Sequence, residues 1–318
     1  MSGRNLRIIV CVLGAPRSGT TMLASMLAST PETIALPEMA YLHDLMELDS
    51  KGTLDADKFR EILVTSHRFK NSRICDNDQE IFDLFIPNDL TGTISNILEK
   101  YNQRNDCKIF NSWVEHTPHN ARAADLWLKY FPQAKFIHIV RDGRGVAEST
   151  MRQAWGMKDI VRLAENWNSR INSIRQLQAR LGDRITEVRY EDLIQSPEST
   201  LRRVCETMGL RFQESMLSNN GIHNLKHLAG AELIGKSADM SRLYAWKNEL
   251  KDWEILHFTA ICRKNLELYH YEASKGRELN PIYCIFIKLI GKIKHHYSKK
   301  RFLSEVSKVE NLKRGCNS

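Results

Sequence analysis

A glycine-rich loop near the start of the chain carries the residue types best suited to bind a phosphate. It follows the apolar run Ile8–Leu13 and reads Gly14-Ala15-Pro16-Arg17-Ser18-Gly19-Thr20-Thr21. A loop between a strand and a helix presents successive backbone N–H groups at the helix N-terminus, where an anion is favoured. Gly14 and Gly19 have the G-x-x-x-x-G spacing of a nucleotide-phosphate loop. We therefore expect a phosphate group here, and an ordinary glycine turn before a helix is the alternative.

The loop lacks the lysine that normally follows its second glycine, because Thr20 stands in that place. A triphosphate enzyme would miss this lysine at its β- and γ-phosphates. Arg17 lies within the loop instead, and Thr20 and Thr21 add hydroxyl donors. This set suits a 5′-phosphosulfate that is bound without a metal.

A second candidate anion site follows the apolar run Lys135–Val140. Arg141 offers a bidentate guanidinium, and Ser149, eight residues later, adds a hydroxyl donor. A surface ion pair between Arg141 and Asp142 is the alternative for this arginine. Arg144 and Arg152 are weaker candidates for the same task.

Three stretches of the chain match one known family in the same order. They are GAPRSGTTMLASMLASTPE, FPQAKFIHIVRDGRGVAESTMR and RYEDLIQSPESTLRRVCETMGL. They resemble blocks of the sulfotransferase superfamily that uses 3′-phosphoadenylyl sulfate, in particular the broad branch that includes protein-tyrosine sulfotransferases. The resemblance covers about 5–45, 113–155 and 185–255. It implies that the 5′-phosphosulfate is bound by Arg17, Ser18, Gly19, Thr20 and Thr21, that the 3′-phosphate is bound by Arg141 and Ser149, and that Tyr190 lies against the nucleotide.

The resemblance also offers two candidates for the base that deprotonates the acceptor hydroxyl. Glu38 falls in the place of the glutamate base of tyrosine sulfotransferases. His116 falls where cytosolic sulfotransferases carry a histidine base, although relatives in the closer branch have a lysine there. We favour Glu38. The alternatives are a surface or helix N-terminal acid for Glu38 and a structural histidine bonded to a backbone carbonyl for His116. Glu115 and His119 flank His116 and are easily mistaken for it.

The pattern of apolar runs predicts an α/β fold of the P-loop type, a three-layer sandwich with a central parallel sheet. We expect strands at Ile8–Leu13, Lys135–Val140 and Ile185–Tyr190, and a helix from Pro197 to Met208 that Gly209 ends. Residues 51–110 are more polar and indicate a helical insertion on the acceptor side. The predicted division is a sulfotransferase domain at 1–281 and a tail at 282–318.

Lys236–Leu250 resembles the C-terminal loop that closes over the 3′-phosphate in this family. Its candidate phosphate contacts are Lys236, Ser237, Arg242 and Lys247. For any single one of these residues we favour a plain amphipathic helix over a phosphate contact, with Trp246 as a packing residue.

Most of the net charge of +8 lies in the tail. Residues 282–318 contain nine Lys or Arg and two Glu, so 9 − 2 leaves +7 there and 8 − 7 leaves +1 for the rest. This distribution argues against a nucleic-acid-coating protein. Apolar clusters alternate with lysines in the tail, which is typical of a peripheral membrane helix, and a docking helix is the alternative.

Seven cysteines without a C-x-x-C pair favour reduced thiols over a zinc site. Neither a signal peptide nor a run of about 18 apolar residues is found, so we expect a cytoplasmic protein or one on the cytoplasmic membrane face.

The residues together predict a sulfotransferase that releases adenosine 3′,5′-bisphosphate and needs no metal. The hydroxyl acceptor stays open between a carbohydrate, a peptide tyrosine, a lipid-linked saccharide and a small alcohol. The rival functions are a P-loop phosphotransferase or kinase and a non-catalytic nucleotide-binding module.

Overall fold

The computed structural model describes residues 6–105, 109–222 and 240–273. The chain divides into two compact units. The first contains Met1–Val140 and Ile174–Asp239, and the second contains Arg141–Ser173 and Met240–Ser318. The tail at 282–318, with its predicted membrane contact, lies outside the described residues.

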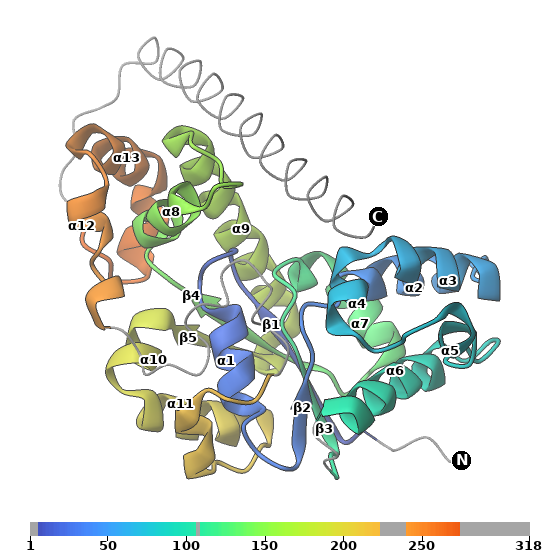
Figure 1. Cartoon of the computed structure of the whole chain (residues 1–318). Helices are drawn as coiled ribbons and strands as arrows, with labels where there is room; N and C mark the ends of the chain where they lie inside the picture. Colours follow the sequence, from blue (N-terminus) through green and yellow to red (C-terminus); the bar gives the residue numbers. More distant parts are fainter. Residues whose placement is uncertain (1–5, 106–108, 223–239, 274–318) are drawn as a thin grey trace, which may run out of the picture. The chain divides into compact units, whose positions relative to one another are not determined.

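The first unit is built around a five-stranded parallel sheet in the order β2-β3-β1-β4-β5 (Figure 1). Val10 on the central strand pairs with Val114 on one side and with Lys135 on the other. The strands are β1 (Ile8–Leu13), β2 (Thr33–Ala35), β3 (Ser112–Glu115), β4 (Lys135–Val140) and β5 (Ile185–Arg189). Runs of β-branched residues such as IIVCVL suit strands that are covered on both faces.

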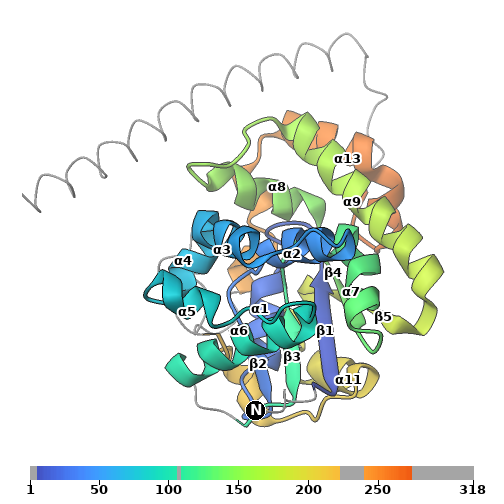
Figure 2. The same cartoon turned by 90° about the vertical axis from the view of Figure 1, so that its right-hand side faces the viewer.

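Helices cover both faces of this sheet, as the alternation of β1 side chains requires. Ile9, Cys11 and Leu13 belong to one continuous core cluster with residues of α2 (Tyr41–Ser50), α6 (Leu90–Asn105) and α7 (Ala124–Tyr130). Figure 2 shows the sheet from the side on which α6 lies. On the other face α1 (Thr20–Leu27) contacts β1, and α10 (Tyr190–Gln195) and α11 (Pro197–Met208) contact β5. The predicted three-layer α/β sandwich is confirmed.

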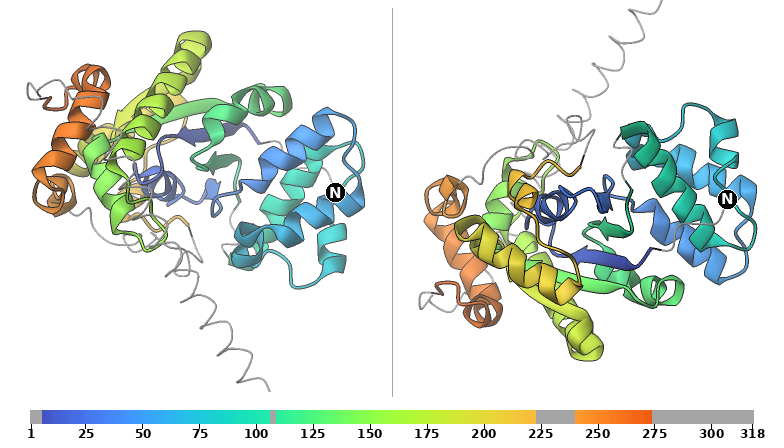
Figure 3. Two further views of the ribbon diagram at one scale, coloured as in Figure 1. Left: turned by 90° about the horizontal axis from the view of Figure 1, so that it is seen from above. Right: turned by 90° about the horizontal axis from the view of Figure 1, so that it is seen from below.

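The predicted helical insertion is a group of helices that includes α3 (Ala56–Thr65), α4 (His67–Ser72) and α5 (Asp78–Phe82), followed by α6. The side chains of Asp55, Ser66 and Asn77 cap these three short helices by accepting backbone N–H groups. In both views of Figure 3 the helices from α2 to α6 lie together, apart from α10 and α11.

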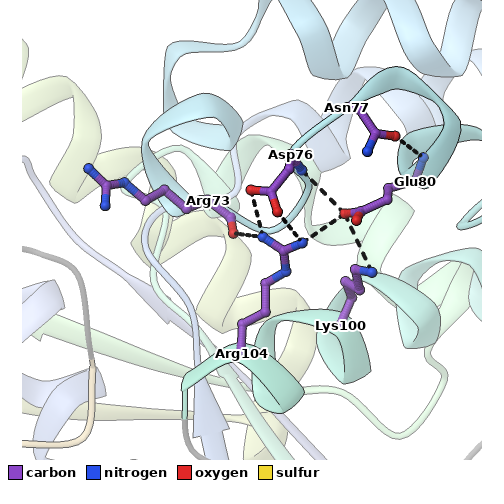
Figure 4. Close-up of polar contacts among 6 residues, drawn as sticks. All are labelled: Arg73, Asp76, Asn77, Glu80, Lys100 and Arg104. Carbon is purple, nitrogen blue, oxygen red and sulfur yellow. Dashed lines mark hydrogen bonds and ion pairs between the residues drawn. The ribbon is translucent and has the colours of Figure 1, made fainter.

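An ion-pair network fastens the segment before α5 to the last turn of α6 (Figure 4). Arg104 donates to Asp76 Oδ1 at 2.9 Å, to Asp76 Oδ2 at 2.8 Å and to the carbonyl oxygen of Arg73 at 3.2 Å. Glu80 accepts from Arg104 at 2.8 Å and lies 3.4 Å from Lys100. The hydrogen bond from Arg104 lowers the pKa of the Asp76 carboxyl. The network therefore holds α4 and α5 against α6.

The second unit is helical. Its elements are α8 (Gly143–Arg152), the part of α9 (Ile160–Leu181) that ends at Ser173, a 3₁₀ turn (Met240–Arg242), α12 (Trp246–Glu249) and α13 (Asp252–Leu268). A Cβ at Gly143 would lie 2.5 Å from the ring of Phe258, so α8 and α13 approach closely there. Asn265 bridges α13 to α9 through bonds of 2.7 Å to Asn168 and 2.9 Å to Asn172.

The strongest local signals of the sequence are confirmed. Strands at Ile8–Leu13 and Lys135–Val140 have the predicted bounds, and α11 runs from Pro197 to Met208 and ends at Gly209 with φ 80°. The alternative of one amphipathic helix over 236–250 is wrong in its described part, because a 3₁₀ turn and the short α12 occupy it. Lys236 and Ser237 lie outside the described residues.

Candidate active site

The glycine-rich loop connects β1 to α1 through a tight turn. The N–H of Ser18 donates to the carbonyl oxygen of Ala15 at 3.1 Å, and Arg17 has φ 72°. Pro16 and Arg17 are the central residues of this turn, and the second of them takes the left-handed conformation usually left to glycine. A non-glycine residue held in that region costs free energy, and such residues cluster at functional sites.

Both glycines of the loop are needed for close contacts. A Cβ at Gly14 would lie 2.8 Å from the carbonyl oxygen of Ile139 on β4. Gly19 has φ 95°, and a Cβ there would lie 2.6 Å from Cδ2 of Tyr190, the first residue of α10. The structure therefore brings Tyr190 against the loop. Its predicted contact with the nucleotide stays a prediction.

The N-terminus of α1 is suited to an anion. Gly19 is its N-cap, no side chain caps it, and its first turn contains no acidic residue. Ser18 is buried, and its Oγ has no hydrogen-bond partner. A buried hydroxyl without a partner is costly unless a ligand satisfies it. The loop therefore fits a phosphate or sulfate group.

Arg141 and Ser149, the candidate ligands of the 3′-phosphate, both lie in the second unit and are both buried. Arg141 donates from Nη2 to the carbonyl oxygen of Arg242 at 3.0 Å, and its own carbonyl oxygen accepts from Trp167 at 3.2 Å. Its guanidinium lies against Gly145, where an added Cβ would be 3.2 Å from Nε. Ser149 lies on α8, two turns after its start.

Arg144 has a structural partner. It donates to both carboxylate oxygens of Asp142, at 3.0 and 2.7 Å, and its guanidinium carbon lies 3.9 Å from the centre of the Trp246 ring. Asp142 also caps α8 by accepting the backbone N–H of Arg144. Trp246 is buried, in agreement with the packing role expected for it. Lys247 pairs with Glu272 at 3.3 Å.

Glu38 lies in the first unit, between β2 and α2. Its carboxylate is 2.8 Å from Nη2 of Arg68 on α4, and the two side chains are 22% and 39% exposed. The Glu38 side chain is therefore partly exposed. Sequence reasoning missed Arg68, because no motif links residues 30 positions apart.

His116 is buried, with 1% of its surface exposed. Its Nε2 donates to the carbonyl oxygen of Leu36 at 2.9 Å, because a carbonyl oxygen can only accept. Nδ1 is buried without a partner. His116 thus contacts the segment that carries Glu38, and of these two side chains Glu38 is the more exposed.

Glu115, which sequence reasoning treated as a mere neighbour of His116, is buried at the end of β3. Its carboxylate accepts the backbone N–H of Met39 at 3.3 Å and that of Thr117 at 3.0 and 3.1 Å. Thr117 Oγ1 and Asn120 Nδ2 donate to it as well. The only signal in the sequence was an acidic residue at the end of an apolar strand.

Within residues 6–105, 109–222 and 240–273, no three His, Cys, Asp or Glu side chains gather as metal ligands would. In the same ranges, no helix is both long and apolar enough to cross a membrane.

Comparison with known proteins gives consistent matches. The model of the sulfotransferase family matches residues 10–214. A putative protein-tyrosine sulfotransferase of Caenorhabditis briggsae is 24% identical over 246 residues, which cover 74% of this chain and 74% of that protein. Protein-tyrosine sulfotransferase A of Caenorhabditis elegans is 23% identical over 239 residues, and the match covers 72% of this chain but 54% of that protein.

A similar fold is found among solved structures. The sulfotransferase domain of the olefin synthase from Synechococcus PCC 7002 superposes with a TM-score of 0.58 at 22% identity. The superposition covers 86% of this chain and 98% of that domain.

Proposed function

The chain belongs to the sulfotransferase family, and we propose that it transfers a sulfuryl group from 3′-phosphoadenylyl sulfate to a hydroxyl acceptor. The observation that carries the choice of donor is the loop at the start of α1. There, a buried Ser18 hydroxyl without a partner lies next to a helix N-terminus that no side chain caps. Arg17 supplies a cation from within the loop, whereas a triphosphate enzyme has a lysine after the second glycine, where this chain has Thr20.

The 5′-phosphosulfate is bound by the loop residues Arg17, Ser18, Gly19, Thr20 and Thr21. Tyr190, whose ring lies against Gly19, packs beside the nucleotide. Arg141 and Ser149 bind the 3′-phosphate, which accounts for a buried arginine and a buried serine outside the loop. The proposed contacts to the donor are all made by protein groups.

The reaction is an in-line displacement at sulfur. The acceptor oxygen forms a bond to sulfur while the bond from sulfur to the bridging phosphate oxygen breaks. Glu38 takes the hydroxyl proton, because its side chain is partly exposed whereas His116, the other candidate base, is buried. The charge that develops on the leaving phosphate is balanced by Arg17 and the backbone N–H groups of the loop. The products are a sulfate ester and adenosine 3′,5′-bisphosphate.

His116 holds the segment that carries Glu38 rather than acting as the base. Its Nε2 is bonded to the carbonyl oxygen of Leu36 at 2.9 Å, and the ring is buried. Because Nε2 donates this bond, the nitrogen left to take a proton is Nδ1, and Nδ1 is buried.

The acceptor is proposed to be a tyrosine hydroxyl of a peptide or protein, because the names of the two relatives describe protein-tyrosine sulfotransferases. The helices α3 to α6 form the acceptor side, since Arg68 of α4 binds the proposed base. Carbohydrate and lipid-linked hydroxyls are the alternative acceptors.

Incubation with ³⁵S-labelled donor tests the proposal. The purified chain is given a tyrosine-containing peptide, an oligosaccharide mixture and a lipid extract in separate reactions. Label in the peptide that is lost when its tyrosine is replaced by phenylalanine supports the proposal. Label in the sugar or lipid fraction alone would overturn the acceptor, and no label in any fraction would count against the transferase activity.

A further inference from the structure

Glu115 is a buried carboxylate without an ion-pair partner among the described residues. It is 2% exposed and lies beside Cys11 in the register of β3 and β1. Burial raises the pKa of the Cys11 thiol, and the charge of Glu115 raises it further. A buried acid of this kind is unfavourable unless hydrogen bonds satisfy both of its oxygens.

The groups around Glu115 are all hydrogen-bond donors toward it. Oε1 accepts from the N–H of Met39, and both oxygens accept from the N–H of Thr117. Asn120 donates to Oε2 from Nδ2. The orientation of this amide is fixed, because Oδ1 of Asn120 accepts from Trp127 Nε1, which can only donate. The position therefore suits a group that accepts hydrogen bonds at both of its oxygens, as the Glu115 carboxylate does.

The bonds from residues 115 and 116 bracket Glu38 on both sides. Glu115 accepts the N–H of Met39, the residue after Glu38, and His116 bonds to the carbonyl oxygen of Leu36, two residues before it. Two consecutive residues at the end of β3 thus fix the backbone that presents the Glu38 carboxylate.

The same cluster reaches the strand that leads into the phosphate loop. Asn120 Nδ2 lies 3.4 Å from the carbonyl oxygen of Val12, two residues before Gly14. Asn120 therefore contacts the end of β1 with the same amide group that donates to Glu115. The Glu38 segment and the strand before the donor loop are tied to one carboxylate.

We propose that Glu115 is a positioning residue for sulfuryl transfer, which acts through the Met39 N–H to hold Glu38 in place relative to the phosphate loop. This inference rests on the proposed role of Glu38 as the base. Arg68 restrains only the tip of the Glu38 side chain, and both side chains of that pair are partly exposed. The bond to Glu115 is buried and acts on the backbone next to Glu38 rather than on the tip of its side chain.

The test compares Glu115→Gln and Glu115→Asp with Glu254→Gln. Glutamine places an N–H₂ donor where the neighbouring groups already donate. Aspartate keeps the carboxylate but is shorter by one methylene, so the 3.3 Å contact to the Met39 N–H is lost. Glu254 is a matched control, because it is also buried and also accepts a backbone N–H, that of Lys251 at 2.8 Å. If Glu115→Gln does not fold, Glu115→Asp carries the test.

The first readout is the rate of transfer from ³⁵S-labelled donor to the tyrosine peptide, beside the calorimetric affinity for adenosine 3′,5′-bisphosphate. Both Glu115 variants should lower kcat about ten- to hundredfold, because small misplacements of a catalytic group have effects of this size, and leave the bisphosphate affinity unchanged. Glu254→Gln should leave both quantities unchanged. Wild-type kcat in Glu115→Asp, or an equal loss in Glu254→Gln, would overturn the proposal.

The second readout is independent of activity. Amide hydrogen exchange should be faster over 36–40 in the Glu115 variants and unchanged there in Glu254→Gln. Wild-type exchange over 36–40 in Glu115→Asp would contradict the positioning role. If exchange over 36–40 is faster in the Glu115 variants but the wild-type chain transfers no sulfate to any hydroxyl, the proposed function is contradicted. The restraint of Glu115 on this segment is then still established.

Discussion

The ring of Tyr190 packs against the backbone of Gly19, where an added Cβ would lie 2.6 Å from Cδ2 of the ring. The contact joins the first residue of α10 to the N-cap residue of α1. Gly19 is thereby restricted twice, once by φ 95° and once by the ring. The loop that is proposed to bind the 5′-phosphosulfate therefore depends on a residue more than 170 positions further along the chain.

Gly19→Ala should disturb this contact and weaken donor binding. Strain at positive φ costs about 1–2 kcal/mol, and the clash with Tyr190 adds to it. Gly209→Ala is the matched control, because Gly209 has φ 80° but nothing lies within 4 Å of an added Cβ. We expect both variants to unfold at lower temperature and only Gly19→Ala to lose affinity for adenosine 3′,5′-bisphosphate in calorimetry. Equal affinities of the two variants for adenosine 3′,5′-bisphosphate would show that Gly19 is not part of the donor site.

Arg141→Ala should weaken binding of adenosine 3′,5′-bisphosphate but not of adenosine 5′-monophosphate, which lacks the 3′-phosphate. Loss of a charge-assisted hydrogen bond of 1.5–3 kcal/mol corresponds to a roughly ten- to hundredfold weaker affinity. Gly145→Ala should act in the same direction, because its Cβ would lie 3.2 Å from Arg141 Nε. Arg180→Ala, which removes an exposed ion pair with Asp125, serves as the control. An equal loss of affinity for both nucleotides would show that Arg141 does not bind the 3′-phosphate.

Glu38→Gln should lower kcat by about 10²- to 10⁴-fold, the range for loss of a general base, with donor affinity retained. Arg68→Ala keeps the Glu38 carboxylate and removes its partly exposed ion pair. Such pairs contribute about 0–1 kcal/mol to stability, so Arg68→Ala should fold normally and retain more activity than Glu38→Gln. Transfer assays at saturating donor measure both variants. If Glu38→Gln keeps wild-type kcat while His116→Ala abolishes transfer in a folded protein, the assignment of the base is reversed.

Cys75 should react slowly with iodoacetamide in the folded protein. Burial, followed by the charge of Glu80, raises the pKa of this thiol to about 11. The reactive thiolate is then roughly a thousandth of the population at pH 8, about two orders of magnitude below that of an unperturbed thiol. Peptide mapping by mass spectrometry should show alkylation of Cys75 that rises with pH up to about 11. A rate that levels off below pH 9 would contradict the raised pKa.

Features encoded by neighbouring residues were predictable from the sequence. β1 and β4 are uninterrupted apolar runs, and α11 begins with Pro197 and ends at Gly209. β2 was missed because three residues are too few to show a pattern. β3 was missed because its buried ends, Ser112 and Glu115, are polar.

In the candidate site, too, the features set by neighbouring residues were predictable and the features set by distant residues were not. The loop around Arg17 was found from its spacing, and the prediction of a sulfotransferase is confirmed by the family match over 10–214. The roles of Glu38, His116, Arg141 and Ser149 stay predictions. The restraints on Glu38 could not be predicted, because Arg68 and Glu115 are distant from it in sequence and are brought to it by α4 and β3.

Calorimetry with two nucleotides tests the central claim, the identity of the donor, most directly. The chain is titrated with adenosine 3′,5′-bisphosphate in the presence of a chelator and with ATP in the presence of magnesium. We predict tight binding of the bisphosphate that needs no metal and is lost in Arg17→Ala. Tight magnesium-dependent binding of ATP, with none of the bisphosphate, would contradict the account and favour a phosphotransferase.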